Sequence, residues 1–168
     1  MNIPENIIKM NKTPLDNFYF YKANEAFEKL SAVKESGYFD DLMASAINTL
    51  ERYYKGFLCA ADEYDENYYL PRHDFLTKDH DLIKLVREIQ KNYPEVFPYQ
   101  SRNEWNETSN FLRDMRHAYT AVRYNENSSY QDFKKLLSYI EIQKERITDY
   151  IKTKGFNVEM ESEFVEDL

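Results

Sequence analysis

Glycine and cysteine are scarce in this chain of 168 residues. The three glycines, Gly37, Gly56 and Gly155, are too few for a protein built from tight β-turns. They are also too scattered to form a glycine-rich loop around a phosphate. The single cysteine, Cys59, has no partner in the chain for a disulfide, and we predict that it is a buried core thiol.

Metal-binding and membrane-spanning patterns are also missing. The three histidines, at positions 73, 80 and 117, do not have the spacing of a zinc site. No apolar run approaches the ~20 residues of a membrane helix, and the N-terminal residues lack the features of a secretory signal. We therefore expect no metal, no cofactor and no membrane contact, and a cytoplasmic location.

Charge is unevenly distributed along the chain. The net charge is -8, and residues 155–168 contribute -5 of it because they hold five acids and no base. The remaining -3 on residues 1–154 excludes nucleic-acid binding by bulk charge but leaves room for a local basic patch. We expect the acidic tail either to be mobile or to dock on a partner.

The apolar residues recur at three- and four-residue steps in five segments, which predicts five helices. Residues 65–78 show no clear period and are predicted to be a loop. The fold class is therefore all-α, an up-and-down antiparallel bundle of about five helices, with an extension at 1–12, the bundle at 13–154 and the acidic tail at 155–168. The predicted helices cover 13–37, 40–64, a short segment from residue 79, 101–124 and 128–154.

Capping signals support these boundaries. Thr13-Pro14 resembles a helix start, and Gly37 is placed to end the same helix. Ser101 to Glu104 and Ser128 to Gln131 both match the capping box that opens a helix.

The fourth helix carries the segment that is most suggestive of chemistry, residues 113–124. Arg113, His117, Thr120 and Tyr124 share one face at steps of four, three and four residues. This face differs from the apolar stripe of the same helix, and Arg116 and Arg123 flank it. The apolar stripe consists of Trp105, Thr108, Leu112, Met115, Tyr119 and Val122.

This basic face suits the chemistry of a phosphodiester. The ordinary pKa of histidine, about 6.5, suits general acid–base catalysis near neutrality. An arginine fork binds a phosphate through two hydrogen bonds. The alternative is structural: Arg113 and His117 pair with Asp114 or other nearby acids on a solvated surface.

Three features in order resemble the HEPN domain, a small helical domain of prokaryotic toxin–antitoxin and nucleotide-binding systems. The second helix is rich in alanine and contains Lys55. The third helix opens with His80-Asp81-Leu82. The fourth helix closes with Arg123-Tyr124 and a long last helix follows. The resemblance covers about residues 16–152.

The resemblance implies a helical bundle, usually a homodimer. Many members are metal-independent RNases that carry an arginine, four to six further residues, a histidine and sometimes a tyrosine two positions later. His117-Ala118-Tyr119 matches the second part of this pattern, whereas only three residues separate Arg113 from His117. A shift of one position turns a side chain by about 100° around the helix axis.

A second branch of the family lacks the nuclease pair and binds nucleotides, or pairs with a separately encoded nucleotidyltransferase or antitoxin. Five residues are candidates for binding nucleotide or RNA in this way: Lys55, His80, Arg116, Arg123 and Tyr124. Each also has a structural interpretation, such as a helix-surface position for Lys55 or packing for Tyr124.

Three functional hypotheses follow. The first is a HEPN-like domain that binds nucleotide or RNA in a toxin–antitoxin or defence system. The second is an active RNase that uses Arg113, His117 and Tyr119. The third is a non-catalytic interaction domain. Tyr64, Tyr68 and Tyr69 are expected to be exposed, where they would stack on bases or fill an interface.

Overall fold

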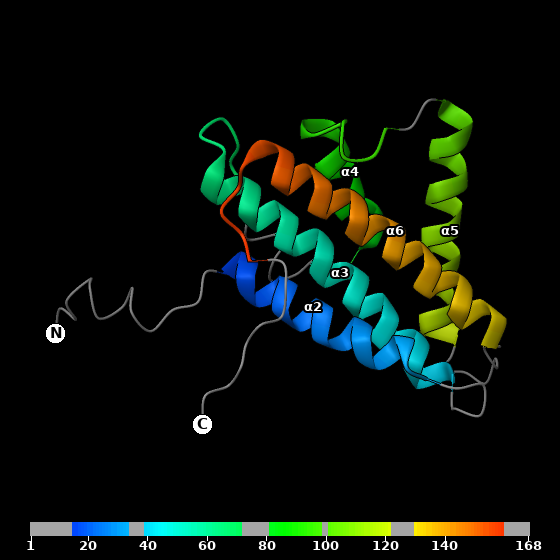
Figure 1. Ribbon diagram of the computed structural model, residues 1–168. Helices are drawn as coiled ribbons and strands as arrows, with labels where there is room; N and C mark the ends of the chain where they lie inside the picture. The colour runs from blue at the N-terminus through cyan, green and yellow to red at the C-terminus, as the bar shows by residue number, and fades with distance from the viewer. Residues whose placement is uncertain (1–14, 34–38, 72–80, 99–100, 122–129, 160–168) are drawn as a thin grey trace, which may run out of the picture.

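The computed structural model describes residues 15–33, 39–71, 81–98, 101–121 and 130–159, without the side chains of residues 15, 39–40 and 115–121. Within these residues all regular secondary structure is helical, which confirms the predicted all-α bundle (Figure 1). The described helices are α2 (Leu15–Ser31), α3 (Phe39–Tyr64), α4 (Leu82–Asn92), α5 (Arg102–Ala121) and α6 (Tyr130–Lys154).

Helix α3 is the central element, because each of the other four helices packs against it. Every residue from Tyr53 to Ala61 is buried, so this part of α3 has no solvated side. Such all-round burial is typical of a helix enclosed by the rest of the protein. Cys59 lies in this stretch, and its predicted burial is confirmed.

Helices α2 and α3 form an antiparallel pair, as predicted. The hydroxyl of Tyr53 donates a hydrogen bond of 2.6 Å to Oδ1 of Asn24 in the buried interface. About one turn later on α3 and one turn earlier on α2, the ring of Phe20 lies against Gly56. The absence of a side chain at Gly56 therefore lets α2 approach α3 closely.

Helices α3 and α6 run in the same direction. Tyr54 donates a hydrogen bond of 3.1 Å to Oε1 of Gln143, and the ring of Phe57 contacts that of Tyr150 at 5.7 Å. Contacts that advance together along both helices define a parallel pair. Helices α4 and α5 lie in the connection between them, and α5 stands across the other long helices in Figure 1.

Side-chain caps fix the starts of α4 and α5. Asp81 caps α4 by accepting a hydrogen bond of 3.0 Å from the N–H of Ile83, so the helix starts later than the predicted residue 79. The predicted cap at Ser101 is confirmed, because its Oγ accepts the N–H of Glu104 at 3.2 Å.

Other predicted boundaries differ or are not covered. Helix α2 ends at Ser31, six residues before the glycine that was expected to end it. Thr13, Pro14, Gly37 and Ser128 lie outside the described residues.

The predicted apolar faces of the shorter helices are confirmed where they are described. The face of α4 is buried in full: Leu82, Leu85, Val86 and Ile89. On α5, Leu112 is buried and Trp105 is partly buried. No helix in the described part of the chain is long and apolar enough to cross a membrane.

The chain folds back on itself after α6. Gly155 adopts a left-handed φ of 72°, and the N–H groups of Gly155 and Phe156 donate to the carbonyls of Lys152 and Ile151. This hydrogen-bond pattern is the Schellman motif, which favours glycine at the left-handed position. The ring of Phe156 then stacks on Tyr64 at 5.9 Å.

This packing corrects the expectation that the whole tail is mobile or docks on a partner. Phe156 and Val158 are partly buried against the core, and the N–H of Glu159 donates to Oδ1 of Asn17 on α2 at 3.3 Å. Residues 155–159 therefore belong to the bundle. Residues 160–168, which hold most of the acids, lie outside the described residues.

The tyrosine prediction also needs correction. Tyr68 is only 6% exposed and its hydroxyl donates to Oε1 of Glu88 at 3.1 Å. Tyr64 stacks within the chain and donates to the carbonyl of Asn157 at 2.8 Å. Only Tyr69 of the three is open to solvent, at 86% exposure.

The close approach at Gly56 gives a test of the core. In Gly56→Ala, the new Cβ would lie 2.9 Å from Cε1 of Phe20, closer than carbon atoms pack. Alanine alone favours a helix over glycine by about 1 kcal/mol. We expect the overpacking to outweigh this gain and to leave a net loss of about 1–2 kcal/mol, measured by urea denaturation.

Phe20→Leu provides the control. In that background the added methyl group meets a smaller side chain, so Gly56→Ala should cost less than in the wild-type protein. A Gly56→Ala variant as stable as the wild type would show that α2 and α3 do not depend on this contact.

Candidate functional site: a cationic groove between α4 and α5

The structure places only part of the predicted basic segment. Arg113 is exposed on α5, and its Nη1 donates to Oδ1 of Asn110 at 3.5 Å. Asn110 lies one turn before Arg113 along α5, whereas position 117 lies one turn after it. The side chains of Arg116, His117 and Tyr119 are not described, and Arg123 and Tyr124 lie outside the described residues.

The remaining predicted binding residues separate from this segment. Lys55 is 3% exposed, and its Nζ lies 3.7 Å from Oε2 of Glu51. Its helix-surface interpretation is therefore wrong. His80 lies outside the described residues, and the neighbouring Asp81 caps α4.

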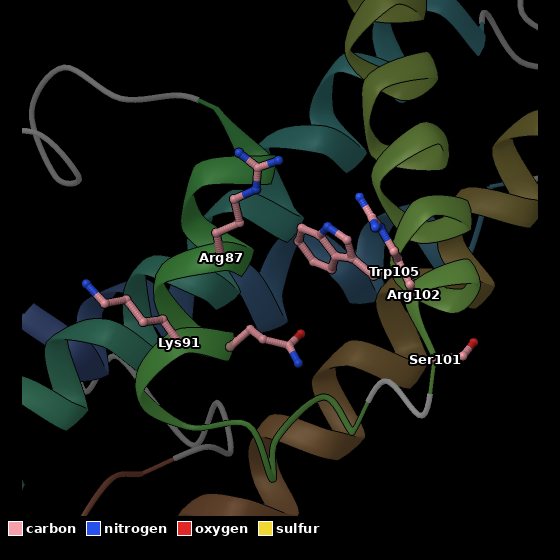
Figure 2. Close-up of a pocket in the computed structure, with 6 residues that line it drawn as sticks. Arg87, Lys91, Ser101, Arg102 and Trp105 are labelled. Atoms are coloured by element: carbon pink, nitrogen blue, oxygen red, sulfur yellow. The ribbon is translucent and has the colours of Figure 1, made fainter.

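A groove of about 540 Å³ lies between α4 and the start of α5. Figure 2 shows the indole of Trp105 between the two helices, with Arg87 on the α4 side, Arg102 beside it on α5, and Lys91 further along α4. The lining residues are Arg87, Gln90, Lys91, Ser101, Arg102 and Trp105.

The lining of this groove is cationic. It includes three basic side chains, Arg87, Lys91 and Arg102, and no acid. None of the three forms an ion pair with another residue in the described part of the chain. This positive charge is local, because the chain as a whole carries -8.

Helix α4 presents its basic residues as a row. Lys84, Arg87 and Lys91 recur at steps of three and four residues, which aligns them along one side of the helix. All three are exposed, whereas Leu85 and Ile89 are buried on the opposite side. Helix α4 therefore packs against the core with one face and exposes its basic face to solvent.

Helix α5 segregates its charges. Arg102 and Arg113 are eleven residues apart, close to three full turns, so they share one edge. The acids Glu104, Glu107 and Asp114 lie more toward the other side of the exposed surface. The basic edge therefore starts at the groove and continues toward the predicted histidine position.

An aromatic surface accompanies these charges. The guanidinium carbon of Arg87 lies 5.7 Å from the centre of the Trp105 ring, a distance typical of a cation–π contact. The indole is partly buried, and Leu112 anchors the same helix in the core. A half-covered indole next to arginines can stack on a planar ligand whose anionic groups the arginines bind.

The groove is not evident from the sequence. Trp105 falls on the apolar stripe of its helix, and nothing in the pattern relates it to Arg87 and Lys91. The basic row on the third predicted helix was a usable signal, but its meaning depends on how α4 meets α5. Among the described residues, no group of three histidine, cysteine or acidic side chains is placed to hold a metal ion.

A second unusual feature is a buried carboxyl group, that of Asp16, near the exposed Glu63 in the last turn of α3. Asp16, in the first turn of α2, is 1% exposed, and neither carboxylate oxygen has a hydrogen-bond partner. Burial, followed by the charge of the nearby Glu63, raises the pKa of Asp16 from 3.8 to about 6. When protonated, Asp16 can donate to Glu63, which two ionised carboxylates cannot do.

Comparison with known proteins found no family model, no curated protein and no solved structure that matches the chain.

The pKa of Asp16 predicts how stability depends on pH. Below about pH 4 the group is protonated in both the folded and the unfolded chain. Between about pH 4 and 6 it ionises only in the unfolded chain, so folding stability falls as pH rises through this window. A shift of this size corresponds to a loss on the order of 2–3 kcal/mol.

Asp16→Asn removes this titration. We expect the variant to be more stable than the wild type at pH 7 by on the order of 1–2 kcal/mol, and the difference to shrink toward pH 4. Denaturant melts across this range measure it. Asp149→Asn, an exposed position on α6, is the matched control, and an identical pH profile in both variants would contradict the assignment.

Proposed function

We propose that the chain binds RNA or a nucleotide, and that the groove between α4 and α5 is the binding site. The observation that carries the proposal is the combination of Arg87, Lys91 and Arg102 with Trp105 in one groove that no acid lines. Phosphate needs positive charge and hydrogen-bond donors, and a nucleobase needs a flat apolar surface. In Figure 2, Arg87 and Arg102 lie nearest to the Trp105 indole, whereas the Lys91 ammonium points away from it and adds charge at the edge of the groove.

The phosphate end of the ligand is expected near Arg102. Its guanidinium is suited to two parallel hydrogen bonds with phosphate oxygens. The first turn of α5 also supplies N–H donors, since the first N–H groups of a helix have no partner within the helix. Ser101 uses its Oγ on Glu104, which leaves the amides of Arg102 and Asn103 for an anion.

The base end of the ligand is expected on Trp105. Stacking of a base on an aromatic side chain contributes about 1–3 kcal/mol. The resemblance to HEPN domains, whose ligands include nucleotides and RNA, supports the same ligand class. The homodimer, and the toxin–antitoxin setting that the resemblance implies, stay predictions.

Binding is favoured over catalysis for this chain. The guanidinium of Arg113 contacts Asn110 rather than extending toward position 117, and its spacing from His117 departs from the nuclease pattern. The groove, in contrast, is lined by basic and aromatic side chains that suit ligand binding, and its lining includes no histidine or acid for proton transfer.

Titration of the protein with a short unstructured single-stranded RNA tests the proposal. Trp105 is the only tryptophan in the chain, so quenching of its fluorescence reports directly on the groove. We expect saturable quenching in the wild type. Arg87→Gln with Arg102→Gln should weaken binding at least tenfold, since each contact to a charged group contributes about 1.5–3 kcal/mol.

The matched control is Arg146→Gln with Lys152→Gln, which removes the same charge from exposed positions on α6. It should leave the affinity nearly unchanged. The groove variant should also show a shallower salt dependence, because fewer counterions are released on binding. Equal losses in the two double variants would show that only net charge matters, and the groove would be rejected as the site.

The nuclease hypothesis has a separate test. We expect the purified protein to leave mixed RNA intact in the presence of EDTA, for the wild type and for His117→Ala alike. Metal-independent cleavage that His117→Ala abolishes would replace the binding proposal with an RNase. Gel analysis of end-labelled RNA distinguishes the two results.

A further inference from the structure

We infer that the groove holds a single adenine base between Arg87 and Trp105, and that Gln90 determines this specificity by accepting a hydrogen bond from the amino group of the base. The inference rests on the proposed function, and it adds the part of the ligand that is recognised. Three observations carry it: the distance between Arg87 and Trp105, the hydrogen-bonding state of Gln90, and the exposure of the side chain that has to move.

The distance between Arg87 and Trp105 is intermediate. Stacked planar groups approach to about 3.5 Å, so a base inserted between two planes needs about 7 Å. The observed distance of 5.7 Å from the guanidinium carbon to the ring centre is too long for direct stacking. This distance is little more than 1 Å shorter than the separation of about 7 Å that a guanidinium–base–indole stack needs.

The side chain of Arg87 is the part that moves when a base enters between Arg87 and Trp105. It is exposed on α4, and rotation about its side-chain bonds moves the guanidinium without moving the helix. Trp105 is partly buried against the core and stays as the fixed wall. The slot therefore opens at low cost, since no core contact is broken.

Gln90 supplies the recognition group. It lines the groove, and its Oε1 is buried without a hydrogen-bond partner. A buried polar atom without a partner destabilises the fold, and such atoms are uncommon in folded proteins. Because Gln90 is only partly buried as a residue, rotation about its side-chain bonds can turn this covered oxygen toward the groove, where an N–H donor of a ligand removes that cost.

An amino-bearing base fits this requirement. A glutamine side chain carries an acceptor beside a donor, and adenine carries an amino donor beside a ring-nitrogen acceptor, so the two groups pair through two hydrogen bonds. Adenine is also bicyclic and covers more of the indole than a pyrimidine does. The phosphate of the same nucleotide then lies toward Arg102.

The experiment compares two RNA oligomers that differ by one functional group. One is oligoadenosine, and the other has the same length but contains purine riboside, which lacks the amino group. Quenching of Trp105 gives the affinity of each. We expect the wild type to bind oligoadenosine about threefold to tenfold more tightly, which corresponds to one hydrogen bond of 0.5–1.5 kcal/mol.

Gln90→Leu and Gln90→Met test the residue itself. Both remove the acceptor and keep the bulk of the side chain, and two variants guard against a folding defect in one of them. We expect each to abolish the preference for oligoadenosine over the purine riboside oligomer, because neither side chain offers the amide oxygen that accepts from the amino group.

The results separate the two proposals. Equal binding of both oligomers by the wild type, with binding still sensitive to the Arg87 and Arg102 substitutions, overturns the adenine inference and leaves the proposed function intact. A preference for oligoadenosine that survives in both Gln90 variants also overturns the role of Gln90. Absence of quenching by either oligomer overturns the proposed function as well.

Discussion

The enclosure of α3 is the constraint on which the rest of the structure depends. A helix that is buried all round must satisfy every polar side chain it carries, because an unpaired polar group in the core costs stability. Tyr53 meets this requirement through Asn24 on one side, and Tyr54 through Gln143 on another. These bonds specify which neighbours α3 accepts, and hence where α2 and α6 lie.

The parallel course of α3 and α6 then determines what the middle of the chain does. A chain that leaves the end of α3 must return to the other end of the molecule before α6 begins, and α4 and α5 make this return. Helix α4 buries Leu85 and Ile89 and turns its basic row outward. The groove is thus formed where the returning segment changes direction, at the junction of two helices.

The sequence predicted the helices well because their periodic apolar residues reflect burial directly. The predicted cap at Ser101 located the start of α5, whereas α4 begins after Asp81 and not at the predicted residue 79. The direction of α6 relative to α3 was beyond this reasoning, since periodicity identifies a buried face but not its partner. The groove could not be predicted for the same reason, because Arg87 and Trp105 are neighbours in space and not in the sequence.

The prediction for the C-terminal segment was wrong for residues 155–159 because it relied on composition. The count of acids in residues 155–168 concealed Phe156 and Val158, which pack against the core. Gly155 was visible as a helix end, yet the consequence of its left-handed conformation, a chain that turns back onto Tyr64, depends on the position of α3. Of the predicted site residues, Lys55 is enclosed with Glu51, a location that an isolated helical pattern does not reveal.

The two faces of α4 have a consequence for how such a protein diversifies. The residues that maintain the fold and the basic residues that line the groove alternate along one short helix, the first buried and the second exposed. Under the proposed function, substitutions at the exposed Arg87 or Lys91 would alter ligand choice with little penalty to folding, whereas substitutions at the buried Leu85 or Ile89 would do the reverse. Descendants of this chain can drift in what they bind while their architecture remains fixed, so groove chemistry, more than overall shape, would separate them.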